Sequence, residues 1–462
     1  MIEKQVVKYL EGLRKRQPLP LRVKLWNGST VALDDEPRVE LRLNDAASAR
    51  YFLKPSMSSL GEAFVEGLID VEGPIRSVIE VAEGLSRDQD PRDTRGPGVL
   101  HDWITRHTRR SDRKAIEYHY DVSNEFYSLW LDPRMVYSCA YFRTGDEDQG
   151  RGKLPSWLAR HTRKSDRKAI EYHYDVSNEF YSLWLDPRMV YSCAYFRTGD
   201  EDLETAQVQK LDHICRKLML APGQTLLDIG CGWGAMAIHA AKHYGVKAVG
   251  VTLSTNQYEL ARERVREAGL EDRVEIRLQD YRDVPGDASF DRISSIGMFE
   301  HVGLKNLRGY FDTVHRLLKP GGVAMNHGIT SSDADNRSVG LGAGDFIDKY
   351  VFPDGELPHV SLAIRELSAA GLELTDAESL RRHYAKTLWF WSDGFERNVA
   401  RLTALAGEKR ARIWRVYFAG CAHAFTHGWI NLYQLLAIKP RPGASGAESP
   451  LPLSREYMYG PR

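Results

Sequence analysis

The amino-acid sequence predicts an α/β protein with a doubly wound, Rossmann-like sheet, a helical lid and a small N-terminal α+β domain. Beyond residue 200, short apolar runs alternate with amphipathic helical segments, the pattern of a parallel sheet with helices on both faces. Beyond residue 330, aromatic-rich segments that include 389–391 and 413–438 are expected to form helices of the lid. The expected strands are residues 225–229, 248–253, 274–278, 290–296 and 323–329.

The first hundred residues have a different pattern. Residues 1–16 are charged and have helical spacing, residues 21–25 and 38–43 resemble short strands, and residues 75–85 have apolar helical periodicity. Residues 86–100 are rich in Asp, Arg, Gly and Pro, which is typical of a linker. These patterns predict a small α+β domain followed by a connection.

One segment of the chain is present twice. Residues 106–148 recur at 160–202 with one change, Arg110 to Lys164. Near identity at surface positions argues against a periodic architecture, in which repeats resemble each other mainly where they pack. We assign the functional role to the second copy because it alone continues directly into the main domain. Three alternatives stay open for the first copy: it is looped out, disordered or exchanged for the second. The predicted division is a module at 1–94, the extra copy at 95–148, the second copy at 149–202, the main domain at 203–440 and a tail at 441–462.

Composition limits the functional classes. The 462 residues include 63 Lys plus Arg and 63 Asp plus Glu, which removes the positive field that a nucleic-acid binder shows. No apolar run approaches the roughly 20 residues of a membrane span, and the charged start is unlike a signal peptide. We therefore expect a cytoplasmic protein. Its five cysteines form no C-x-x-C pair, so reduced thiols and no metal site are expected.

A glycine-rich turn follows the first strand of the main domain. The turn reads Gly230-Cys231-Gly232-Trp233-Gly234 and opens a helix. Glycines let the main chain approach a ligand, and a helix N-terminus offers unpaired N–H groups, although dinucleotide sites and simple tight turns share this pattern. Asp228 within the strand, the close glycine spacing and Gln279-Asp280-Tyr281 after the third strand resemble class I S-adenosylmethionine-dependent methyltransferases.

That resemblance implies a set of cofactor-binding residues. Asp280 is expected to accept from the adenine amino group, and Tyr281 to stack on the ring. The end of the second strand lacks the acidic residue that usually binds the ribose hydroxyls, so Gln257 is the expected substitute. The full set is Tyr191, Ser192, Asp228, Gly230, Cys231, Gly232, Thr252, Ser254, Gln257, Gln279, Asp280 and Tyr281.

Longer motifs resemble the cyclopropane-fatty-acyl-phospholipid synthase family. They include EYHYDVSN at 171–178, YSCAYF at 191–196, GMFEHVG at 297–303, YVFPDG at 350–355 and, in the first module, SLGEAFVEG at 59–67. The ordered match covers nearly the whole chain except the extra copy and the tail. It implies transfer of a methylene group from S-adenosylmethionine to the cis double bond of an unsaturated phospholipid acyl chain, which gives a cyclopropane.

The resemblance also implies a reaction centre. Methyl transfer to an alkene leaves a carbocation that must lose a proton, and in this family the base is a bound bicarbonate ion. The groups that hold it correspond to Cys193, Glu300, His327, Tyr384 and the main-chain amide of Ile329. Each also has a structural interpretation, such as a core cysteine or a helix-capping glutamate. Because the carboxyl ends of strands in an α/β sheet face one crevice, the catalytic assignment is favoured.

Membrane access follows from the same resemblance. It implies a protein peripheral at the inner face of the membrane, with the phospholipid bilayer as its partner and a lipid-binding first module that allows a homodimer. Basic runs at 106–110 and 160–164 are candidates for contact with anionic lipids, although such runs are usually solvated helix faces. The alternatives are a methyltransferase that produces a methylene or methyl-branched chain, and a lipid-binding homologue that has lost catalysis. No nucleic-acid substrate is expected.

Overall fold

The computed structural model describes residues 2–53, 55–87, 177–334, 340–352, 356–441 and 449–459. The chain divides into one compact unit of residues 1–89 and 163–462 and a second unit of residues 90–162. The second unit lies outside the described residues. The same holds for the first duplicated copy, for both basic runs and for the predicted linker beyond residue 87.

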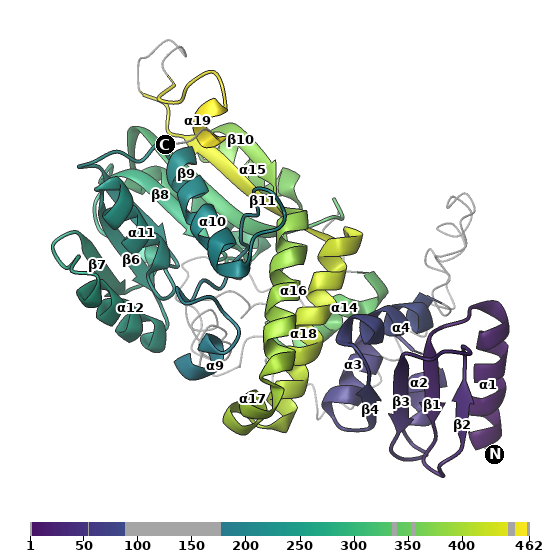
Figure 1. Ribbon diagram of the computed structural model, residues 1–462. Helices are drawn as coiled ribbons and strands as arrows, with labels where there is room; N and C mark the ends of the chain where they lie inside the picture. The colour runs from purple at the N-terminus through teal and green to yellow at the C-terminus, as the bar shows by residue number, and fades with distance from the viewer. Residues whose placement is uncertain are drawn as a thin grey trace, which may run out of the picture. The chain divides into compact units, whose positions relative to one another are not determined.

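The N-terminal module is a small sheet with four helices, as predicted (Figure 1). Its strand order is β2-β1-β3-β4. Alternate residues of β1 and β3 are buried, and they form one core with the apolar face of α1. Its elements are α1 Ile2–Arg16, β1 Leu21–Lys24, β2 Thr30–Ala32, β3 Val39–Leu43, α2 Ala49–Leu53, α3 Met57–Val65, β4 Ile69–Glu72 and α4 Ile75–Arg87.

The main domain is built on a seven-stranded sheet of order β10-β11-β9-β8-β5-β6-β7. The five strands β9, β8, β5, β6 and β7 are parallel to one another in this spatial order. Strand β11 is antiparallel to both of its neighbours, β9 and β10. The strands are β5 Thr225–Ile229, β6 Lys247–Thr252, β7 Val274–Leu278, β8 Phe290–Ile296, β9 Leu318–Ser331, β10 Glu373–Ser379 and β11 Ile430–Ile438. This mostly parallel sheet confirms the predicted fold class, with β9 extending beyond the predicted 323–329 at both ends.

Helices cover both faces of the sheet because successive strand residues point to opposite sides. Leu226 of β5 packs in a cluster with residues of α10, α11 and α12, whereas Leu227 packs in a cluster with residues of α13 and α15. The sheet is therefore doubly wound. These helices are α10 Leu203–Lys217, α11 Ala235–Tyr244, α12 Thr255–Glu267, α13 Leu307–Leu317 and α15 Val360–Ala369.

Five helices of the main domain contribute to one large hydrophobic cluster that is rich in aromatic residues. They are α9 Asn178–Ser182, α14 Ala343–Tyr350, α16 Arg381–Arg397, α17 Val399–Ala406 and α18 Glu408–His427. The prediction of helix across 413–438 is wrong in its last part, since Ile430–Ile438 forms strand β11. Gly428 ends α18 with a left-handed φ of 73°, and the following run is buried between β9 and β10, where strand pairing satisfies its main chain.

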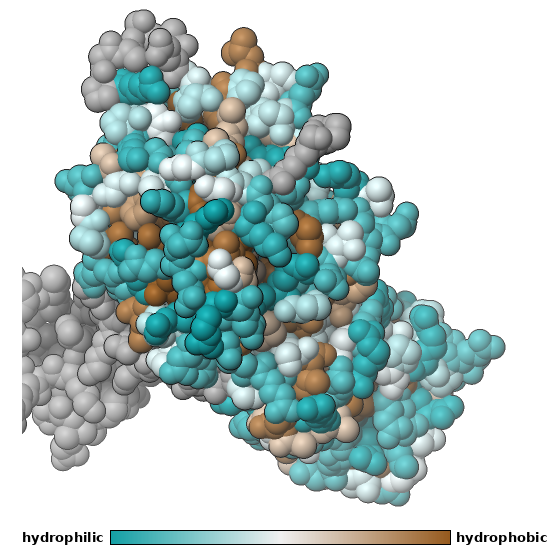
Figure 2. Space-filling model, turned by 60° about the vertical axis from the view of Figure 1, so that its left-hand side comes forward, coloured by the Kyte–Doolittle hydropathy of each residue, from teal (hydrophilic) through white to brown (hydrophobic). Residues whose placement is uncertain are grey.

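Short elements complete the domain. They are the 3-10 turns η2 Tyr281–Asp283, η3 Phe299–His301, η4 Leu304–Asn306 and η5 Gly340–Gly342, and the helix α19 Glu456–Tyr459. Part of the predicted tail packs on the domain, because Arg455 pairs with Asp376 at 2.7 Å and Met458 is buried. Figure 2 shows a largely hydrophilic face with hydrophobic residues in recesses. Within the described ranges, no helix is long and apolar enough to cross a membrane.

Candidate active site

A cavity lies at the carboxyl ends of β5, β6, β7 and β8. Strand β5 lies between β6 and β8, and such a switch in strand order is where open α/β sheets bind ligands. Eleven of the twelve predicted cofactor residues line this cavity, with Ser254 as the exception. The lining residues are Tyr191, Ser192, Asp228, Gly230, Cys231, Gly232, Thr252, Gln257, Gln279, Asp280 and Tyr281.

The turn after β5 requires glycine. Gly230 and Gly232 have φ values of 76° and 54°, in the left-handed region. A Cβ on Gly230 would lie 2.9 Å from the Cβ of Met298, which follows β8. The turn then enters α11 at Ala235. A ligand can therefore closely approach both the main chain of this turn and the N-terminus of α11.

Asp228 is a buried carboxyl in the cavity wall. Its Oδ1 accepts a hydrogen bond from Ser294 Oγ at 2.8 Å. Burial raises the pKa of Asp228 to about 6, while the Ser294 hydrogen bond and the positive charge of Lys210 oppose that rise. The carboxyl is therefore held by protein groups at the edge of the cofactor cavity.

Lys210 is a cavity residue that the sequence reasoning missed. It lies on α10, is 1% exposed, and donates from Nζ to Ser192 Oγ at 2.9 Å. Burial lowers the pKa of Lys210 to about 8, although the nearby carboxyl groups of Asp186 and Asp228 favour its charged form. The helical spacing of α10 could have indicated that Lys210 is buried, because it places Lys210 on the same face as the apolar residues Leu211 and Ile214.

Asp280 and Tyr281, the two residues predicted to bind adenine, follow β7. Arg282 donates to both carboxylate oxygens of Asp280, from Nε at 2.9 Å and from Nη2 at 2.7 Å. A carboxylate has about four lone-pair sites, so Asp280 keeps the capacity to accept from a ligand. Tyr281 lies edge-on to Tyr310 with ring centroids 5.7 Å apart. Both Asp280 and Tyr281 line the cavity.

Gln257 is held by its neighbours at the start of α12. Thr252 Oγ1 donates to Gln257 Oε1 at 2.8 Å, which leaves the amide nitrogen of Gln257 as a donor. Ser254, predicted as a cofactor residue, instead caps this helix, because its Oγ accepts from the Gln257 main-chain N–H at 3.3 Å. Ser254 thus orients Gln257 and is not among the cavity-lining residues.

Glu300 is fixed by the main chain of the neighbouring strand. The last paired residues of β8 and β9 are Ile296 and His327, so the Ile329 amide lies beyond the end of β8. Glu300 Oε1 accepts a hydrogen bond from this amide at 2.7 Å. Glu300 Oε2 is buried and has no hydrogen-bond partner in the part of the chain that the structure describes. Burial raises the pKa of Glu300 to about 7, opposed by the Ile329 hydrogen bond, so the carboxyl titrates near neutral pH.

His327 presents a second buried polar atom without a partner. Its Nδ1 lies 3.1 Å from Gln434 Nε2, and donation from that amide nitrogen places the proton of the neutral ring on Nε2. His327 Nε2 is buried, and no described residue forms a hydrogen bond with it. Burial lowers the pKa of His327 well below its ordinary value, which keeps the ring neutral. An unpaired buried N–H is costly, and a bound acceptor removes that cost.

Cys193 and Tyr384 belong to the same aromatic cluster, and Ile329 packs against it. Cys193 Sγ lies 3.2 Å from the carbonyl oxygen of Ala194. Burial raises the pKa of both Cys193 and Tyr384, so the thiol and the phenol keep their protons. Both groups are therefore hydrogen-bond donors in apolar surroundings.

The predicted reaction centre adjoins the cofactor cavity. Gly297 lines the cavity, and its N–H donates to the carbonyl oxygen of His327 at 2.9 Å. Ser192 also lines the cavity and precedes Cys193. Tyr191, another lining residue, has its ring 5.2 Å from that of Trp391 on α16. The two predicted sets of residues are thus neighbours in space.

Comparisons with known proteins agree with this geometry. The family model described as mycolic acid cyclopropane synthetase matches residues 107–151 and 161–435, and a domain family of unknown function matches residues 8–88. A probable fatty acid methyltransferase of Pseudomonas putida is 44% identical over 96% of this chain and 96% of its own length. The cyclopropane-fatty-acyl-phospholipid synthase of Escherichia coli K12 is 43% identical over 57% of this chain and 66% of its own length.

Solved structures show the same relationship. The mycolic acid cyclopropane synthase CmaA1, complexed with SAH and CTAB, is 37% identical, with a TM-score of 0.56 over 59% of this chain and 98% of its own. The fold and the glycine-turn cavity thus define an S-adenosylmethionine-dependent methyltransferase. More narrowly, the chain belongs to the mycolic acid cyclopropane synthetase family, whose members act on lipid acyl chains.

Proposed function

We propose that this enzyme transfers a methylene group from S-adenosylmethionine to the cis double bond of an unsaturated phospholipid acyl chain, giving a cyclopropane fatty acyl chain. One observation carries the proposal: Glu300 Oε2, on the turn after β8, and His327 Nε2, on β9, are buried beside the cofactor cavity and have no hydrogen-bond partner among the described residues. The named activity of the Escherichia coli relative supports the choice of substrate.

The chemistry explains why an apolar site needs such groups. The methyl carbon forms a bond to one alkene carbon as its bond to sulfur breaks, which leaves S-adenosylhomocysteine and a carbocation on the other alkene carbon. A proton then leaves the transferred methyl group, and the electron pair of that C–H bond closes the ring. The protein must hold a proton acceptor near the new methyl group and exclude water that would trap the cation.

The residues fit bicarbonate as that acceptor. Cys193, Tyr384 and His327 Nε2 are donors for an anion, and Glu300 Oε2 is an acceptor for its O–H group. When bound, bicarbonate supplies a base in the apolar site. The resemblance assigns the Ile329 amide to the anion, but this amide donates to Glu300. We therefore infer that Ile329 positions Glu300.

Aromatic rings connect the cofactor cavity with the reaction centre. Tyr191 contacts Trp391 at a centroid distance of 5.2 Å, and Trp391 contacts Tyr384 edge-on at 5.9 Å. Aromatic faces stabilise a desolvated cation by about 2 kcal/mol. This series of rings provides both the apolar wall for an acyl chain and a favourable field for the carbocation.

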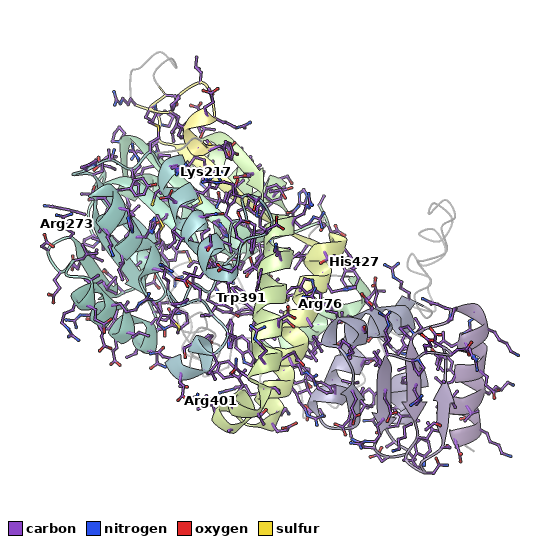
Figure 3. The ribbon with its side chains drawn as sticks, in the orientation of Figure 1. Arg76, Lys217, Arg273, Trp391, Arg401 and His427 are labelled. Carbon is purple, nitrogen blue, oxygen red and sulfur yellow. The ribbon has the colours of Figure 1, made fainter. Side chains whose placement is uncertain are left out.

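A second hollow supports contact with a phospholipid surface. Its basic and aromatic lining comes from α4 and α16, α18 contributes Thr426, and Figure 3 labels Arg76 from α4. Arg76 lies over the ring of Trp389 at 4.2 Å and pairs with Asp393 at 3.0 Å. Exposed Arg382 on α16 lies in the same hollow. Each basic group near an anionic leaflet contributes about 1 kcal/mol to binding.

Vesicle sedimentation tests this contact. We expect the protein to sediment with phosphatidylglycerol vesicles more than with phosphatidylcholine vesicles. Arg382→Glu should reduce sedimentation with the anionic vesicles several-fold, whereas Arg273→Glu, a change beside β7 (Figure 3), should not. Equal sedimentation of both variants would show that the hollow is not the membrane contact.

The test of the activity is product analysis. Purified enzyme, S-adenosylmethionine and vesicles of monounsaturated phospholipid should yield acyl chains heavier by one CH₂ unit. Proton NMR of the extracted lipid should show the strongly shielded hydrogens of a cyclopropane ring. Heavier chains without shielded ring hydrogens would support the second candidate, a methylene or methyl-branched product. The name of the Pseudomonas putida relative, a probable fatty acid methyltransferase, favours keeping that candidate.

A further inference from the structure

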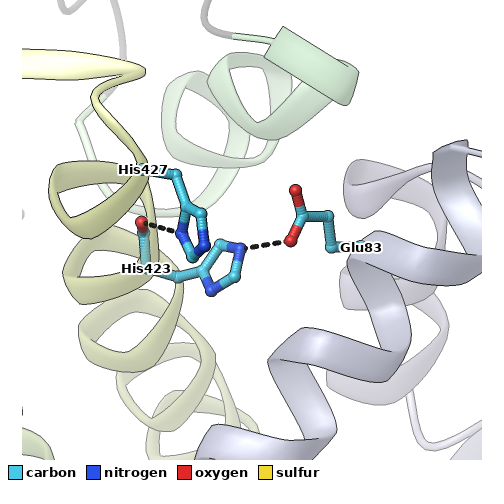
Figure 4. A group of neighbouring side chains, drawn as sticks. All are labelled: Glu83, His423 and His427. Carbon is cyan, nitrogen blue, oxygen red and sulfur yellow. Dashed lines mark hydrogen bonds and ion pairs between the residues drawn. The ribbon is translucent and has the colours of Figure 1, made fainter. Parts of the chain in front are cut away.

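Helix α18 contacts the N-terminal module at both of its ends. Near its start, Arg412 pairs with Asp70 of the module at 2.8 Å. Near its end, His423 Nε2 lies 2.7 Å from Glu83 Oε2 of α4. His427, one helical turn further along α18, lies beside this second contact. Figure 4 shows these three side chains directed toward one another between α4 and α18.

We propose that Glu83, His423 and His427 form a binding site for a divalent transition-metal ion of the zinc class, which ties α4 to α18. One ligand atom from each residue lies within 4.8 Å of the other two. Two imidazole nitrogens and one carboxylate oxygen are an established zinc ligand set, and they leave a fourth position for water. Neither the catalytic residues nor the cofactor cavity includes any of the three.

The orientation of His427 suits a metal ligand. Its Nδ1 lies 3.0 Å from the carbonyl oxygen of His423, and because a carbonyl only accepts, Nδ1 carries the proton. The neutral ring therefore keeps a lone pair on Nε2. A backbone carbonyl that holds the other ring nitrogen is the usual support of a metal-binding histidine. The rings of His423 and His427 are 4.0 Å apart.

Glu83 is oriented by a separate partner. Arg87 donates to Glu83 Oε1 from Nη2 at 2.6 Å and from Nε at 2.9 Å, which turns Oε2 toward His423. Glu83 and His423 are 8% and 3% exposed, whereas His427 is exposed. Glu83 and His423 are thus already paired before an ion binds. Because His427 is exposed, an ion can reach the site from solvent. A bound ion would replace the proton shared between Glu83 and His423.

A second histidine pair provides a matched control. His239 and His243 on α11 have the same spacing, and their rings are 4.5 Å apart. Among the described residues, only Glu83, His423 and His427 form a three-residue group within ligand distance of one another. His243 is exposed, as His427 is. His243→Gln therefore removes an equivalent imidazole without removing the proposed site.

The experiment uses full-length protein without a polyhistidine tag, stripped with a chelator and titrated with Zn²⁺. Bound metal is measured by elemental mass spectrometry after dialysis, and affinity by competition with a chromophoric chelator. We expect about one equivalent for the wild type and His243→Gln. We expect at least about a tenfold loss of affinity for His427→Gln and Glu83→Gln, since each removes one of three ligands.

Thermal unfolding gives an independent readout. Zn²⁺ should raise the melting temperature of the wild type and of His243→Gln but not of His427→Gln, because an ion that binds only the folded state stabilises it. The chelator-treated variants are compared first, so that a loss of folding is visible before metal is added. Substoichiometric binding by the wild type, or equal binding by His427→Gln and His243→Gln, would overturn the proposal. Neither readout depends on methyl transfer.

Discussion

Glu300 Oε1 accepts a hydrogen bond from the main-chain amide of Ile329 at 2.7 Å, across the ends of two neighbouring strands. The Ile329 amide is available to Glu300 because β9 extends beyond the last residue of β8, where it has no β8 residue to pair with. This hydrogen bond holds one carboxylate oxygen and leaves Oε2 buried, with no hydrogen-bond partner within the described ranges. The carboxyl that the proposed reaction needs is therefore positioned by the sheet itself, next to the cofactor cavity but not in its wall.

Glu300→Gln should separate catalysis from cofactor binding. The amide oxygen of glutamine can still accept from Ile329, but the carboxylate is lost. We expect the turnover number to fall by about 100-fold or more, as for other proton-transfer groups, with S-adenosylmethionine affinity changed less than about threefold. Turnover on phospholipid vesicles and calorimetric titration of the co-substrate measure the two quantities. Wild-type turnover in a folded Glu300→Gln variant would exclude a catalytic role for this carboxyl.

The raised pKa of Glu300 also predicts that the free energy of unfolding depends on pH. The pKa of Glu300 is raised to about 7 in the folded protein, above the ordinary value of about 4.3 expected for the unfolded chain. The folded state therefore binds the proton more tightly, and this contribution is complete below about pH 4 and disappears as the pH rises through about 7. Relative to Glu300→Gln, the wild type should lose at most about 4 kcal/mol of unfolding free energy across that window. Urea unfolding at pH 5 and 8 measures it, and a pH-independent difference would contradict it.

Gln257→Ala should weaken cofactor binding without slowing chemistry. The change removes the amide nitrogen that Thr252 and Ser254 orient at the cavity wall. Loss of one hydrogen bond of about 1 kcal/mol predicts a dissociation constant for S-adenosylmethionine higher by about fivefold to tenfold. Turnover at saturating co-substrate should stay near the wild-type value. Ser361→Ala, which removes a hydroxyl on α15, is the control, and an equal effect of both changes would exclude the assigned role.

Cys193→Ala should reduce activity more than Cys139→Ala. Cys193 is buried in the aromatic cluster with Tyr384, and Cys139, the equivalent residue of the first copy, lies outside the described residues. Initial rates at equal protein concentration measure the ranking. The reverse ranking would show that the first copy supplies the reaction centre.

Much of the sheet could be predicted from the sequence because its strands are short apolar runs bounded by turns. The same criterion failed for 430–438, an apolar run directly after an apolar helix, where only Gly428 marks the boundary. Many of the predicted cofactor residues line one cavity because they lie at or just beyond the carboxyl ends of β5, β6 and β7. Lys210 was missed because a lysine on a buried helix face shows no motif. Glu83 and His423 are 340 residues apart, so only the fold brings them together.

The most direct test uses S-adenosylmethionine with a fully deuterated methyl group and a monounsaturated phospholipid. Ring closure removes one deuteron from the transferred methyl group, so the proposed reaction predicts a product that retains two of the three deuterons, both on a strongly shielded ring methylene in the deuterium NMR spectrum. A product that retains all three deuterons would contradict the proposed ring closure, because the carbocation would then have reacted without loss of a deuteron from the transferred methyl group.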